Sequence, residues 1–173
     1  MANGEVLRGS PGLPIYGKNG TILFKTNMSM SVHIVVSWSG GNDVDICGFY
    51  THFPSESVGY SHKRAIDDGN GFTATWDGDD RTGGPEYVDL AYTGSNTLAG
   101  KSFEIRANWF NVGGGKESGS GGNATITATD SKGNKRSCTI MPATEEKRAA
   151  HQNDPGVVIR FNSDGTIRSI TAT

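Results

Sequence analysis

The stretch from Met30 to Trp38 reads MSVHIVVSW and decides the fold. Apolar residues occupy every second position, so one face of an extended chain carries them, while serine, histidine and one valine lie on the other. Residues 101–110 read KSFEIRANWF and repeat this alternation. Both stretches therefore predict β-strands that bury one face, which is typical of antiparallel sheets.

Shorter strand-like segments, separated by turns rich in glycine and polar residues, flank these two stretches. They lie at residues 21–26, 43–50, 72–76, 86–92, 124–129 and 135–140, with a closing pair at 157–161 and 166–170. Short strands at this spacing predict an all-β fold, an antiparallel β-sandwich of about eight to ten strands.

Composition divides the chain into three parts. Residues 1–20 contain glycine and proline too often for a long element and predict an extended arm. Residues 21–141 contain the expected sandwich. Residues 142–173 predict a short helix at 143–151 and then a β-hairpin that turns at 162–165, either within the sandwich or outside it.

Length and charge narrow the class of protein. The chain has 173 residues with a formal net charge of −2, which fits one domain without a basic stripe for binding nucleic acid. It contains no apolar run of about 18 residues, so we expect no membrane partner. No secretory signal is visible, so Cys47 and Cys138 are expected to be reduced rather than bridged.

Acidic residues concentrate between Asp43 and Asp89. This segment holds ten acidic and three basic residues, a formal charge of −7, whereas the rest of the chain carries +5. Ten like charges on folded loops repel one another unless solvent, lysine or a cation offsets them, and clustered carboxylate oxygens suit calcium. The alternative interpretation is that the acidic residues of loop 77–80 form turns and face solvent.

Four pieces of the sequence carry a resemblance to a known family. They are Trp38, DVDI at 43–46, DGDDRTGGPEYVDL at 77–90 and IRANWF at 105–110. Over about residues 30–140 the chain resembles the calcium-binding β-sandwiches of the tellurium-resistance family. The GGPE piece at 83–86 is also similar to an uncharacterised family of bacterial sandwich domains that opens with an Asp-Leu-Asp-Leu strand. The first resemblance implies that loop carboxylates hold calcium, and it places Asp43, Asp45, Asp77, Asp79, Asp80 and Glu86 near the ion.

Motifs for catalysis are not found in the sequence. The histidines are scattered without the His-Glu-x-x-His spacing of zinc enzymes, and no Gly-x-Ser-x-Gly nucleophile elbow occurs. Paired carboxylates leave glycoside hydrolysis open by residue type, but the aromatic residues that a sugar cleft needs are expected in the core. We therefore expect a protein that is not an enzyme.

The separation of charge along the chain suggests a function. Basic residues outside the acidic segment include Arg106, Lys132, Lys135, Arg136, Lys147 and Arg148. They are either ordinary solvated charge or a basic end that meets the acidic end of another copy. We expect a structural or accessory protein of an assembled particle, such as a phage head decoration or tail component, located in the virion with other protein subunits as partners. The alternatives are a free cytoplasmic calcium-binding stress-response protein and a carbohydrate-binding sandwich module.

Overall fold

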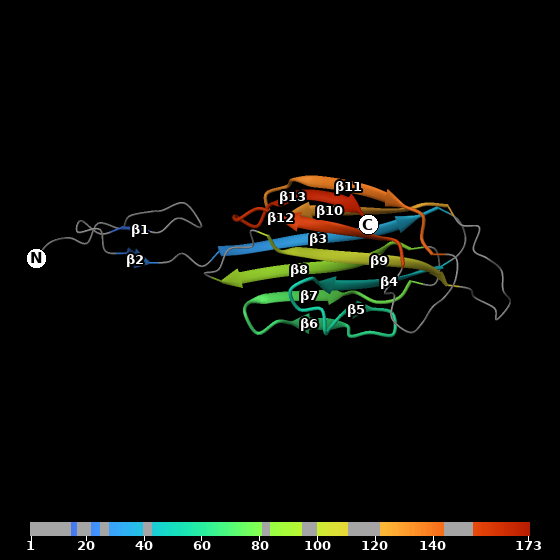
Figure 1. The fold of residues 1–173 in the computed structure, drawn as a ribbon, viewed down its shortest axis with the longest axis horizontal. Coiled ribbons are helices and arrows are strands. Elements are labelled where there is room, and N and C mark those ends of the chain that lie inside the picture. Colours follow the sequence, from blue (N-terminus) through green and yellow to red (C-terminus); the bar gives the residue numbers. More distant parts are fainter. Residues whose placement is uncertain are drawn as a thin grey trace, which may run out of the picture.

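The computed structural model describes residues 15–16, 22–24, 28–39, 43–80, 84–94, 100–110, 122–143 and 154–173 (Figure 1). One sheet contains β3 (Met28–Trp38), β6 (Ala65–Asp67), β7 (Phe72–Trp76), β8 (Glu86–Gly94), β10 (Ala124–Asp130) and β11 (Lys135–Ile140). The other contains β4 (Asp43–Tyr50), β5 (Val58–Gly59), β9 (Ser102–Phe110), β12 (Gly156–Phe161) and β13 (Ile167–Ala172). Their strand orders are β11-β10-β3-β8-β7-β6 and β13-β12-β9-β4-β5. A separate short pair is formed by β1 (Ile15–Tyr16) and β2 (Ile22–Phe24).

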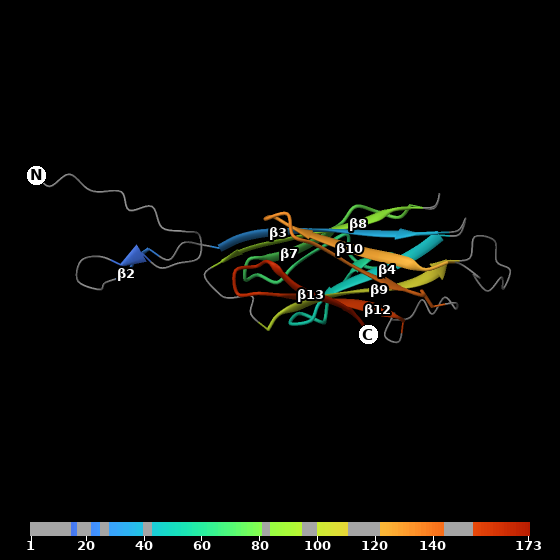
Figure 2. The same cartoon turned by 90° about the horizontal axis from the view of Figure 1, so that it is seen from above.

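The two larger sheets lie one over the other as layers, and all of their strand pairings are antiparallel (Figure 2). This confirms the predicted all-β antiparallel sandwich. The two sheets contain eleven strands, of which β5 and β6 have only two and three residues. Among the described residues there is no helix, and so none that is long and apolar enough to cross a membrane.

The C-terminal hairpin is an integral part of the five-stranded sheet. It is formed by β12 and β13, and β12 also pairs with β9. The expected helix at 143–151 lies outside the described residues, except for residue 143. Most of the expected arm at 1–20 also lies outside them. The two cysteines are free, and they lie in different sheets, Cys47 in β4 and Cys138 in β11.

The centre of the core comes from β3 and β9, the two strands with the cleanest alternation. Their inward residues are Met30, Val32, Ile34 and Val36, and Phe103, Ile105, Ala107 and Trp109. Each of these side chains is at most 4% exposed. Burying one large apolar side chain of this kind stabilises the fold by about 1.5–3 kcal/mol, so the predicted inward faces are confirmed as the main packing surface.

Strand β4 is buried on both faces, unlike β3. Val44 and Ile46 point into the core, and Asp45 and Cys47 on the opposite face are also at most 3% exposed. Strand β5 approaches β4 closely at Gly59, where φ is +130° and an added Cβ would lie 2.0 Å from the carbonyl oxygen of Ile46. Glycine alone tolerates this conformation and this contact, so it allows β5 to pair with β4.

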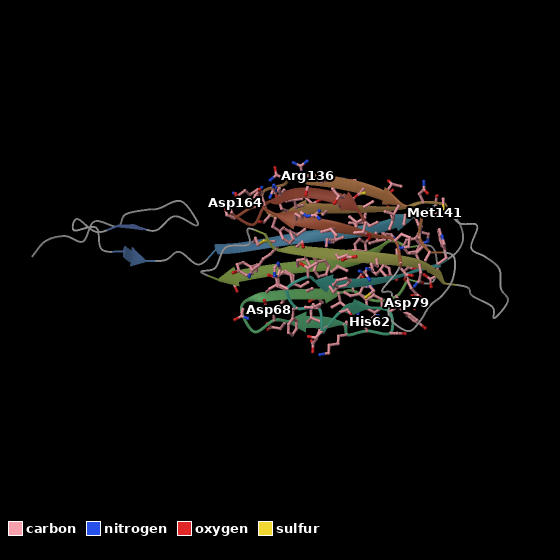
Figure 3. The ribbon with its side chains drawn as sticks, in the orientation of Figure 1. His62, Asp68, Asp79, Arg136, Met141 and Asp164 are labelled. Atoms are coloured by element: carbon pink, nitrogen blue, oxygen red, sulfur yellow. The ribbon has the colours of Figure 1, made fainter. Side chains whose placement is uncertain are left out.

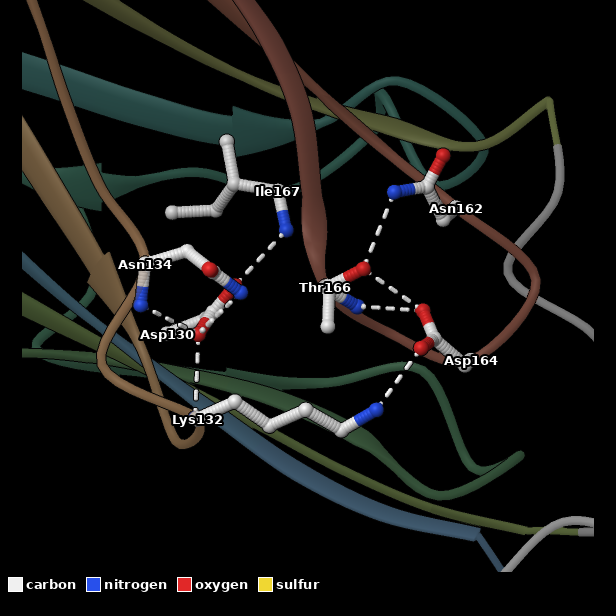
Figure 4. Close-up of polar contacts among 7 residues, drawn as sticks. All are labelled: Asp130, Lys132, Asn134, Asn162, Asp164, Thr166 and Ile167. Carbon is white, nitrogen blue, oxygen red and sulfur yellow. Dashed lines mark hydrogen bonds and ion pairs between the residues drawn. The ribbon is translucent and has the colours of Figure 1, made fainter.

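A buried carboxylate joins the two sheets at the end where β3 begins (Figure 4). Asp130, at the end of β10, is 5% exposed and accepts hydrogen bonds from the backbone N–H groups of Ile167, Lys132 and Asn134, each at 3.0 Å. The Asn134 side-chain amide also donates to Asp130 Oδ2 at 2.9 Å. Lys132 Nζ contacts the neighbouring Asp164 at 2.7 Å. Burial acts to raise the pKa of Asp130, but the donated hydrogen bonds outweigh burial and lower this pKa.

We expect Asp130→Asn to lower the free energy of unfolding at pH 7 by about 2–4 kcal/mol, because it removes the charge that these donors stabilise. An Asp whose pKa is lowered by folding stabilises the protein above its unfolded pKa of about 3.9 and loses this contribution as pH falls. The difference between variant and wild type should therefore shrink toward pH 2.5, as measured by urea unfolding across this pH range.

Asp67→Asn is the matched control, because Asp67 is exposed and accepts one hydrogen bond from Gly69 N at 2.8 Å. We expect this control to cost less than about 1 kcal/mol at every pH. Equal losses in the two variants would contradict the role assigned to Asp130.

Candidate metal centre

Three carboxylates meet at the end of the sandwich where β3 finishes. Asp43 begins β4 in the five-stranded sheet, and Glu86 begins β8 in the six-stranded sheet. Glu86 lies opposite Val36, near the end of β3. Asp79, labelled in Figure 3, comes from the loop between β7 and β8. Two strand starts from different sheets and one connecting loop therefore bring their acidic side chains together.

We refer to Asp43, Asp79 and Glu86 as the acidic trio. One oxygen atom from each carboxylate lies within 4.8 Å of the corresponding atoms of the other two. Asp43 is 2% exposed and Glu86 is 0% exposed, while Asp79 is half-buried. Calcium–oxygen distances of about 2.3–2.6 Å allow two ligands of one ion to lie up to about 5 Å apart. The acidic trio can therefore contact a single calcium ion.

Glu86 has a strongly raised pKa. Burial raises the pKa of Glu86 from its ordinary value near 4.5 to about 8, and the nearby Asp43 and Asp79 add to the rise. Two donors act against it: Trp76 Nε1 donates to Glu86 Oε2 at 2.9 Å, and Asp80 N donates to Oε1 at 3.4 Å. In the absence of a cation, Glu86 therefore holds a proton at neutral pH. A divalent ion among the three carboxylates would displace that proton, and the donor set of hard oxygen atoms fits such an ion.

The loop beside the trio borders an open hollow of about 630 Å³. It is lined by Arg64, Asp77, Gly78, Asp79, Asp80, Pro85 and Tyr87. Tyr87 N donates to Asp77 Oδ1 at 3.0 Å, Asp77 N donates to the carbonyl oxygen of Tyr87 at 3.2 Å, and Arg64 Nη2 donates to the carbonyl oxygen of Asp77. These hydrogen bonds fix the start of the loop against β8.

The structure separates the six predicted calcium ligands into three groups. Asp43, Asp79 and Glu86 form the trio, as described above. Asp77 and Asp80 lie outside the trio and line the adjacent hollow, which Asp79 also borders. Asp45 is also outside the trio: it lies two residues further along β4, opposite Asn108 of β9, and is 2% exposed.

Sequence reasoning missed the indole of Trp76 as part of this site. Trp76 ends β7 and lies opposite Val88 of β8, so it sits beside the strand that begins with Glu86. A tryptophan that immediately precedes an acidic loop can supply a buried N–H donor to a carboxylate of that loop's far end. The position of Trp76 directly before the acidic loop was the signal that the sequence offered. The hydrogen bond itself depends on the register of β7 with β8.

Comparisons with protein-family models, with curated proteins and with solved structures find no match to this chain. The resemblance to the tellurium-resistance family therefore stays a prediction that rests on the residues quoted for it. Fold and site together define an antiparallel β-sandwich with a largely buried carboxylate trio at one end.

We expect Glu86→Gln to change how stability depends on pH when a chelator is present. The folded state holds a proton on Glu86 up to about pH 8, whereas the unfolded chain releases it near 4.5, so wild-type stability should fall as pH rises through this window. The expected fall is on the order of 3 kcal/mol, and Glu86→Gln should remove most of it because glutamine does not ionise. Urea unfolding between pH 5 and 9 measures both proteins.

Glu56→Gln provides the control, because Glu56 is a carboxylate outside the trio that pairs with Lys63. This variant should keep the wild-type pH dependence. A wild-type stability that stays level from pH 5 to 9 in chelator would contradict the burial of an uncompensated Glu86.

Proposed function

We propose that this chain is a non-enzymatic structural β-sandwich that is stabilised by calcium and works as a component of an assembled particle. The observation that carries the calcium part is the acidic trio, in which Asp43 and Glu86 are almost fully buried beside a third carboxylate. Buried carboxylates this close together are costly unless a proton or a cation offsets their charge.

Calcium suits the trio better than other common ions. All three donors are carboxylate oxygen atoms, which disfavours zinc, because zinc sites usually include histidine or cysteine. One donor comes from a loop, and calcium accepts irregular geometry more readily than magnesium does. Water and backbone carbonyl oxygen atoms would complete the six to eight ligands that calcium takes.

The position of the trio supports a structural role for the ion. Asp43 belongs to the five-stranded sheet and Glu86 to the six-stranded sheet, so one ion between them would tie the two layers together. Binding to the folded state alone stabilises it by mass action.

Partner subunits in a virion head or tail are the setting that we propose for this sandwich. The support is the separation of charge, with the acidic loop 77–80 at one end and basic residues of β11 and β13 toward the other. A free cytoplasmic calcium-binding protein is the alternative, and a stable monomer at high concentration would favour it.

Calcium should raise the free energy of unfolding by about 2.7 kcal/mol at a concentration one hundred times its dissociation constant. Asp43→Asn should remove most of this gain, because it deletes one charged ligand of the trio. Denaturant unfolding with calcium and with chelator measures the gain, and the fluorescence of Trp76, compared with Trp76→Phe, reports a change beside Glu86.

Asp89→Asn serves as the control, because Asp89 lies on the same strand as Glu86 but is exposed and pairs with His33. It should retain the full gain from calcium. Identical unfolding midpoints of the wild type in calcium and in chelator would rule out the ion as a stabiliser.

A further inference from the structure

Exposed basic residues occur on and next to the two edge strands β11 and β13, which pack against each other. We call this surface the basic edge. It consists of Lys132, Lys135, Arg136, Arg160 and Arg168, all of which are exposed.

The fold itself places these residues together. Lys132 and Lys135 flank the turn between β10 and β11, which the Asp130 carboxylate holds against Ile167 N at the start of β13. This contact sets Arg168, the next residue of β13, beside the turn. Arg168 is also the extra residue of a bulge, because Ile167 and Ser169 lie opposite the consecutive residues 161 and 160 of β12.

Most of the positive charge on the basic edge is not neutralised within the described part of the chain. Lys132 pairs with Asp164 at 2.7 Å, and Arg160 donates to Thr171 Oγ1 at 2.8 Å. Among the described residues, Lys135, Arg136 and Arg168 form no ion pair. The edge therefore presents cations to whatever approaches it.

The acidic loop 77–80 lies toward the other end of the same molecule. Figure 3 shows Asp79 at one end of the sandwich, while Arg136 and Asp164 lie toward the other. The strand register agrees, because Glu86 lies opposite Val36 near the end of β3, whereas Asp130 lies opposite Val32. One copy thus carries surfaces of opposite charge that lie toward different ends of the sandwich.

We infer that the basic edge binds the acidic loop 77–80 of a second copy of this chain, which gives head-to-tail association. The inference deepens the proposed role in an assembled particle and rests on it. Charged residues and a bulge on edge strands block pairing of their backbones, so side-chain ion pairs rather than added strands make this contact. Head-to-tail contacts between unlike surfaces generate rings or open filaments. The small net charge of −2 leaves little overall repulsion between copies.

Sedimentation velocity of the full chain in calcium, from about 0.01 to 1 mM, tests the inference. We expect concentration-dependent association that is weakened about tenfold or more when salt rises from about 0.05 to 0.5 M, because exposed ion pairs are screened. Arg136→Glu combined with Arg168→Glu should abolish association at low salt. Lys63→Glu is the control, at an exposed position near the opposite edge strand β6. It changes the net charge as much as a single Arg136→Glu does. Lys63→Glu should retain association, whereas Arg136→Glu should weaken it.

Complementation makes the test specific for the two surfaces. Asp77→Lys combined with Asp80→Lys should also prevent self-association, and mixing this protein with the Arg136→Glu, Arg168→Glu protein should restore it. A wild type that stays monomeric at low salt overturns the inference, even if calcium still stabilises the fold. Retention of a short DNA duplex or heparin by a monomeric wild type would instead assign the basic edge to polyanions and would equally overturn it.

Discussion

The structure depends on how acidic side chains are accommodated between two β-sheets. Glu86 is completely buried, and Asp43 is almost so, at an end where their sheets meet. Moving a carboxylate away from water favours its neutral form unless nearby groups compensate the charge. In the trio, a proton on Glu86 and the hydrogen bond from the indole N–H of Trp76 can offset this cost. A bound cation can offset it instead. At the other end, Asp130 keeps its charge because backbone and side-chain N–H groups surround it.

Alternation in the sequence was enough to predict the sandwich and its two central strands. Residues 30–38 and 101–110 bury the predicted faces because the strand period of two residues fixes which side chains point inward. The same rule is not enough for β4, where both faces are covered and where Asp45 and Cys47 are buried as well. The period of two along β4 does not reveal that its second face is also covered.

The site was only partly predictable for a related reason. The sequence marked the loop and the strand starts that carry the acidic trio, but it did not separate the trio from Asp45, Asp77 and Asp80. That separation comes from the pairing of β8 with β3 and from hydrogen bonds that direct Asp77 toward Tyr87 N. Both are long-range features that a linear acidic pattern does not contain.

The proposed ion site and the proposed contact between copies share the loop 77–80. Asp79 belongs to the trio, Asp80 N donates to Glu86, and Asp77 is exposed on the acidic surface of the same loop. An ion held by Asp79 would therefore fix the backbone that presents Asp77, while removing little of the charge at that exposed position. Because both events involve one segment, each must change the affinity of the other by the same factor if they are coupled at all. The proposed calcium site and the proposed contact between copies would then be parts of one physical system at this end of the sandwich.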